Sequence, residues 1–288
     1  MFARLSTLVK MAVPAVLAAA LSLTGCLKSD ETITLYPDGS GKIQLKTTLL
    51  GMMAQMAKMG GMPGEEGQGG GAGKADPFKA IKDGFGGKVY WANLKAEDGP
   101  NGEYMLSGTG YFENVNDVQR KNGKISFQKD PAGEGHLFEL AGEMPNELSG
   151  GPGADGPEAE QQKQMQEMMK GMLAGFDMKV TVVMPGAVKT AEGMKPTEGR
   201  NAVFALTEKD VLAIMDKKMT PPKEMKVTSG APGSLDTEIA AFKEELAKAK
   251  AASAEGAKPA PAAPKGEGEK KAPEGDKGGE KKGGQKDF

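Results

Sequence analysis

Glycine limits the structure of this chain more than any other residue. There are 42 glycines among 288 residues, about twice the usual share of about 7%. Many of them lie in two segments, residues 60–75 and 149–157, and aromatic residues make up only 5% of the chain. We therefore expect one domain with a core of modest size and two long glycine-rich loops.

Between these glycine-rich segments, short stretches of alternating apolar and polar residues predict strands. In the first of them, Ile33 and Leu35 alternate with polar residues, and the turn sequence at 37–41 precedes a second alternating stretch. This is the pattern of a β-hairpin over residues 31–50. Further strands are predicted at residues 88–95, 103–113, 124–128, 136–140, 178–182 and 201–206. Because the connections are short, we expect antiparallel pairing.

Other segments carry apolar residues at helical spacing. They predict helices at 51–59, after Asp76-Pro77, at 165–176 and at 234–251. Thr207 and Asp210 have the spacing of a capping box for one more helix. The predicted fold class is α+β: an antiparallel sheet over residues 31–229, with amphipathic helices packed on one face. Residues 252–288 are too poor in apolar side chains to form a core, and we expect a disordered tail.

The N-terminus has the parts of an export signal. Arg4 and Lys10 form a basic flank, and the apolar run at 11–23 is shorter than the roughly 20 residues that span a bilayer. The ending Leu23-Thr24-Gly25-Cys26 resembles the lipobox of bacterial lipoproteins. The alternatives are an ordinary secreted protein or an anchored helix with an incidental cysteine.

The lipobox resemblance implies that residues 1–25 are removed by cleavage between Gly25 and Cys26, and that Cys26 carries covalent lipid. Residues 26–30 would then be the tether, and the protein would sit on the extracytoplasmic side of a bacterial membrane. Leu27 is not the aspartate that retains enterobacterial lipoproteins in the inner membrane. We therefore expect outer-membrane sorting if the cell has an outer membrane.

A second resemblance concerns the mature chain. The hairpin sequence at 32–41, close after the cysteine, resembles the start of LppM-type bacterial lipoproteins. So does the later pattern at 180–188, with a turn at Gly193 and a strand at 201–206. This resemblance implies an α+β extracytoplasmic domain that contacts lipids or glycolipids and has no assigned catalysis.

The residue inventory argues against an enzyme. There is one cysteine, which the lipid would occupy, and one histidine, so a catalytic or metal-binding histidine cluster cannot form within one chain. We expect His136 to be a strand residue at a sheet edge. The glycine-rich residues before Ala75 do not make a phosphate loop, because Gln68 and Ala75 replace required residues. The net charge of −2 does not suggest nucleic-acid binding. We expect no catalytic residues, no metal cluster and no cofactor other than the lipid on Cys26.

Methionine is unusually frequent, with 19 residues. Two clusters stand out: Met52, Met53, Met56 and Met59, and then Met165, Met168, Met169 and Met172. They could pack within the fold, form a hydrophobic groove for a lipid or protein ligand, or hold Cu(I) through their thioethers. The predicted function is a membrane-anchored, non-enzymatic binding or structural module that contacts lipid, glycolipid or a protein partner. The alternative is a Cu(I)-handling lipoprotein.

Overall fold

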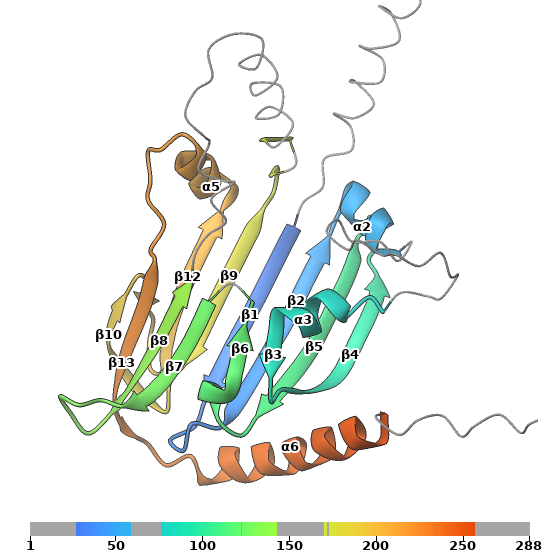
Figure 1. Cartoon of the computed structure of the whole chain (residues 1–288). Coiled ribbons are helices and arrows are strands. Elements are labelled where there is room, and N and C mark those ends of the chain that lie inside the picture. Colours follow the sequence, from blue (N-terminus) through green and yellow to red (C-terminus); the bar gives the residue numbers. More distant parts are fainter. Residues whose placement is uncertain (1–26, 59–75, 122, 143–169, 172, 257–288) are drawn as a thin grey trace, which may run out of the picture. The chain divides into compact units, whose positions relative to one another are not determined.

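A computed structural model describes residues 27–58, 76–121, 123–142, 170–171 and 173–256, and their strands form two sheets (Figure 1). Sheet A contains, in spatial order, β11 (Lys195–Pro196), β12 (Asn201–Thr207), β9 (Asp177–Val183), β1 (Leu27–Leu35), β2 (Gly41–Leu49), β5 (Tyr104–Phe112) and β4 (Tyr90–Asp98). Sheet B contains β10 (Gly186–Glu192), β13 (Glu224–Pro232), β8 (His136–Gly142), β7 (Gly123–Lys129), β6 (Val118–Arg120) and β3 (Phe85–Gly87).

The core lies between the two sheets. In β1, Ile33 and Leu35 are fully buried, whereas Thr32 and Thr34, which alternate with them, are only partly buried. Successive side chains of a strand point to opposite faces, so this alternation gives each sheet one apolar inner face and one polar outer face. The inner faces share one cluster of buried residues, which includes Ile43, Phe112, Phe127, Phe138, Leu140, Val182 and Val227.

The prediction of a strand-rich, mostly antiparallel fold is confirmed, but the expected single sheet with a layer of helices on one face is not. The chain is mostly strand, and its core is closed by a second sheet. β1 pairs antiparallel with β2 but parallel with β9. Sheet B was predicted only in part, because β3 and β6 have three residues each and the pairing of β10 with β13 shifts register twice.

The described helices lie mainly at the ends of the strands (Figure 1). α2 (Gly51–Lys58) follows β2, and α3 (Lys79–Gly84) precedes β3. α5 (Glu208–Met215) follows β12 directly, and its predicted capping box is present: the Thr207 backbone N–H and hydroxyl both donate to Asp210 Oδ2, at 2.8 and 2.7 Å. α6 (Asp236–Gly256) runs five residues past the predicted end at 251.

Several predicted features lie outside the described residues. These are the signal peptide, Cys26, the glycine-rich segments 60–75 and 149–157, residues 165–169 and 172 of the predicted helix 165–176 (whose described residues 173–175 form a turn and not helix), and residues 257–288 of the tail. The predictions for them stay predictions. Among the helices that the structure describes, none is both long and apolar enough to cross a membrane.

Candidate functional site

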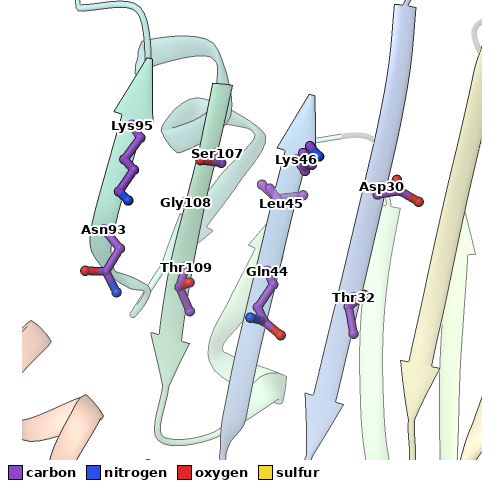
Figure 2. Close-up of a pocket in the computed structure, with 10 residues that line it drawn as sticks. All are labelled: Asp30, Thr32, Gln44, Leu45, Lys46, Asn93, Lys95, Ser107, Gly108 and Thr109. Atoms are coloured by element: carbon purple, nitrogen blue, oxygen red, sulfur yellow. The ribbon is translucent and has the colours of Figure 1, made fainter. Parts of the chain in front are cut away.

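The outer face of sheet A carries a shallow polar depression of about 420 Å³ (Figure 2). Four neighbouring strands contribute to it: β1, β2, β5 and β4. Its lining residues are Asp30, Thr32, Gln44, Leu45, Lys46, Asn93, Lys95, Ser107, Gly108 and Thr109. Hydroxyl, amide and ammonium groups dominate this set, so the depression differs from the mostly apolar pockets that bind drug-like molecules.

Strand alternation explains why these polar side chains share one face. Antiparallel pairing places Gln44 opposite both Thr32 of β1 and Thr109 of β5, so the three residues form a row across the sheet. Directly opposite residues of paired strands have side chains on the same face. Because Ile43 and Leu45 on either side of Gln44 are buried in the core, Gln44 must point outward.

A β-bulge shapes the edge of the depression. Between the pairs Ala92–Thr109 and Lys95–Ser107, β4 has two residues where β5 has one, Gly108. The first of the two, Asn93, has a positive φ of 54°, which is uncommon outside glycine. The second, Leu94, lies over Gly108, where an added Cβ would come within 2.6 Å of Leu94 Cδ2. The bulge therefore turns Asn93 and Lys95 toward the depression, and a side chain at Gly108 would force Leu94 to move.

The depression holds two lysines and one aspartate, Asp30, which lies directly opposite Lys46 in the pairing of β1 with β2, so its net charge is +1. Lys46 and Lys95 form no ion pair with any described residue, and Asp30 accepts no hydrogen bond from the described part of the chain. Thr32, Ser107 and Thr109 likewise keep their hydroxyls free of described side-chain partners. These groups are therefore available to water or to a ligand, and the two ammonium groups favour one that is negatively charged.

The depression is bordered at one end by α6, which crosses the outer face of sheet A. Phe242 of α6 is buried against Tyr36, with ring centroids 4.7 Å apart, and lies 6.2 Å from the ring of Tyr111. The Glu245 carboxylate accepts hydrogen bonds from the Tyr111 hydroxyl and from Lys42 Nζ, both at 3.3 Å. Burial, and then the charge of Glu245, raise the pKa of Tyr111 to about 12. Tyr111 therefore stays protonated and serves as an anchor for the helix.

A buried ion pair lies on the inner side of the same sheet. Glu31 of β1 has 6% of its surface exposed, and its Oε2 accepts a hydrogen bond of 2.6 Å from Arg120 of β6. The other carboxylate oxygen, Oε1, has no described partner. Burial raises the pKa of Glu31, and Arg120 lowers it in part. Because Glu31 lies in sheet A and Arg120 in sheet B, the pair connects the two sheets. Arg120 also lies over the ring of Phe85, its neighbour in sheet B, at 5.2 Å.

The structure corrects the expected position of His136. It is a strand residue, as predicted, but β8 lies between β7 and β13 and is not an edge strand. The side chain is 4% exposed and stacks on Phe127 at 5.0 Å. Burial lowers its pKa, so it is neutral at pH 7. No nucleophile was predicted beside it, and this environment indicates a structural role.

Most of the predicted site residues lie outside the part of the chain that the structure describes. Gly25, Cys26, Met59, Met165, Met168, Met169 and Met172 are not described, and for Met52 and Met56 only the helical backbone is. Met53 packs on the apolar cluster of Leu49, Ala54, Ala57 and Leu106, which is how a packing residue behaves. The Cu(I) alternative therefore stays a prediction. The described residues contain no group of three or more His, Cys, Asp or Glu side chains that could hold a metal.

The depression itself was not predicted from the sequence. Its residues alternate with core residues as in any half-exposed strand, and which strands become neighbours depends on long-range pairing. The one local signal is the run of Thr, Ser, Asn and Gln at outward positions in place of the Lys and Glu residues usual at such positions.

The chain was compared with known proteins. Neither a protein-family model nor a curated protein matches it. Among solved structures, it is similar to the folded domain of the Mycobacterium tuberculosis LppM protein, with 14% sequence identity and a TM-score of 0.33. The match covers 73% of this chain and 94% of that one. The predicted resemblance to LppM-type lipoproteins stays a prediction.

Proposed function

We propose that this protein is a non-enzymatic binding module of the bacterial cell envelope, held on the extracytoplasmic side of a membrane by lipid on Cys26. In this proposal its ligand binds to the outer face of sheet A. The observation that supports the binding role is the polar depression, in which hydroxyl, amide and ammonium groups of four strands lie together without partners among the described residues. The lipobox supports the anchor.

The side chains also indicate the class of ligand. Lys46 and Lys95 would pair with a carboxylate or a phosphate, while Thr32, Gln44 and Asn93 would exchange hydrogen bonds with hydroxyl groups. An acidic saccharide offers both kinds of group. It can be a free glycan or the head group of a glycolipid, since the two share this chemistry.

The test is a binding experiment on the acylated protein in lipid nanodiscs. An array of carboxylated, phosphorylated and neutral oligosaccharides identifies a ligand, and titration calorimetry measures its affinity. Each charged hydrogen bond contributes about 1.5–3 kcal/mol. The double variant Lys46→Gln/Lys95→Gln is therefore expected to weaken binding of an acidic saccharide by about tenfold or more.

A matched control removes the same charge from sheet B. Lys121 and Lys124 are exposed beside or within β7, and the variant Lys121→Gln/Lys124→Gln should bind as the unaltered protein does. If both double variants lose the same amount of affinity, the loss reflects the net charge of the protein and not the positions of Lys46 and Lys95. The proposed ligand site is wrong if no saccharide binds, or if the affinity is unchanged in the Lys46→Gln/Lys95→Gln variant. Presenting the same saccharide free and lipid-linked separates the two sources.

A further inference from the structure

One end of the sandwich contains the first residue of β1 and two helices (Figure 1). Leu27, where β1 begins, pairs with Leu49, the last residue of β2, and α2 starts two residues later. The next residue of β1 pairs with Asp177 of β9, which in turn pairs with Thr207, directly before α5. We call this the α2/α5 end. α6 contacts the strands near their opposite end, through Tyr36 and Tyr111.

We propose that the α2/α5 end lies on the surface of the bilayer that holds Cys26. This inference rests on the lipid anchor of the proposed function. Leu27 is both the neighbour of Cys26 and the first residue of β1, so no linker separates the lipid from the folded sheet. One residue spans at most about 3.6 Å, whereas the nine residues of β1 extend about 30 Å. The α2/α5 end is therefore held at the membrane, and the α6 end is directed away from it.

The surface of the α2/α5 end suits a bilayer. Leu212 on α5 and Met53 on α2 each pack on an apolar cluster of this end and leave part of the side chain exposed. Lys209 and Lys217 are exposed close to Leu212, and neither has a carboxylate partner among the described residues. Apolar side chains that enter the interface and cations that attract anionic head groups are the two contributions to peripheral membrane binding.

The orientation also sets the height of the candidate ligand site. At about 3.3 Å per residue, Asp30 and Thr32 lie about 10 and about 17 Å along β1 from Leu27. A ligand that remains in the anchoring membrane must therefore raise its polar group by roughly that distance. A single phosphate at the bilayer surface is too low, whereas a head group of several sugar units is long enough.

Depth-dependent fluorescence quenching tests the orientation. The only cysteine, Cys26, would be occupied by lipid, so a cysteine introduced elsewhere is the single site for an NBD label. Labels at Met53→Cys and Leu212→Cys, in acylated protein in phosphatidylcholine/phosphatidylglycerol vesicles, should be quenched by doxyl-labelled lipids several-fold more than a label at Lys243→Cys on α6. Lys217→Cys provides an exposed position at the same end, where labelling does not disturb packing.

The outcomes separate this inference from its premise. Quenching that is equal at both ends, or absent from positions 53, 212 and 217 in acylated protein that sediments with vesicles, would overturn the orientation alone. An intact mass without acyl chains, in protein that does not sediment, would overturn the anchor and the orientation together. The saccharide-binding test is independent of both results.

Discussion

Polar side chains around Glu139, on the outer face of sheet B, pair with one another, whereas those of the depression on sheet A have no partners among the described residues. In sheet B, Lys226 Nζ lies 3.2 Å from Glu139 and 3.3 Å from Glu224, and Ser126 donates to Glu139 at 2.9 Å. The Ser126 hydrogen bond, and then Lys226, lower the pKa of Glu139. In sheet A, Lys46 and Lys95 of the depression have no such partners in the described chain.

This difference separates a solvated face from a candidate binding face. Both sheets alternate apolar and polar residues, so alternation alone cannot distinguish them. A face that only meets water satisfies its charges internally at little cost. A face that leaves neighbouring hydroxyl, amide and ammonium groups unpaired retains their hydrogen-bonding capacity for another molecule. The pairing of side chains, and not their polarity, identifies the candidate site.

The largest expected effect comes from the interior of sheet A, where a charge is paired but buried. Arg120→Leu leaves the Glu31 carboxylate without its cation, and we expect the free energy of unfolding at pH 7 to fall by about 3 kcal/mol. Without Arg120 the pKa of Glu31 rises further above its usual value of 4.5. The folded state then binds a proton more readily than the unfolded state, so part of the loss should return as the pH falls from 7 toward 5.

Urea unfolding of the acylated protein at pH 7 and pH 5 measures this effect. The double variant Arg120→Leu/Glu31→Gln is the control, because it removes the titrating carboxylate and should show the same destabilisation at both pH values. A loss in Arg120→Leu that does not depend on pH would show that the pair is not a buried charge pair.

An intermediate change in the free energy of unfolding is expected when two adjacent residues of β1, which point to opposite faces, are compared. Ile33→Val removes one methylene from the fully buried core and should lower the free energy of unfolding by about 1 kcal/mol. Thr32→Val keeps the side-chain shape and should change it by less than about 0.5 kcal/mol, while it weakens ligand binding at the depression. If Thr32→Val destabilises the fold as much as Ile33→Val, the outer face is structural and the comparison fails.

The smallest change in stability is expected for two lysines, one on the outer face of each sheet. Lys226→Gln breaks contacts with two carboxylates and should lower the midpoint of urea unfolding slightly, since exposed pairs contribute little. Lys46→Gln removes no such contact and should leave the midpoint of urea unfolding unchanged. A clear loss of stability in Lys46→Gln would mean that this ammonium group has a structural partner.

Local sequence patterns predicted the elements that depend on near neighbours. The hairpin of β1 and β2, the pair of β7 and β8, and the capping box of α5 each arise from residues close in sequence. The sequence did not predict the parallel pairing of β1 with β9 in sheet A, because it joins residues about 150 positions apart. Nor did it predict the second sheet, in which β13 pairs with β8 across more than 80 positions. For the same reason it gave no sign that Glu31 is buried, since Arg120 is 89 residues away. The depression depends on four strands brought together by such pairing, so it became visible only in the structure.

The position of β1 between β2 and β9 has a mechanical consequence. β1, the strand that follows Cys26 in the sequence, is held on both sides, by nine residue pairs with β2 and seven with β9. A tension applied at Leu27 along this strand loads both ladders in shear, so their hydrogen bonds must fail together rather than unzip one by one. The sheet would therefore resist forces that pull the protein away from its point of attachment.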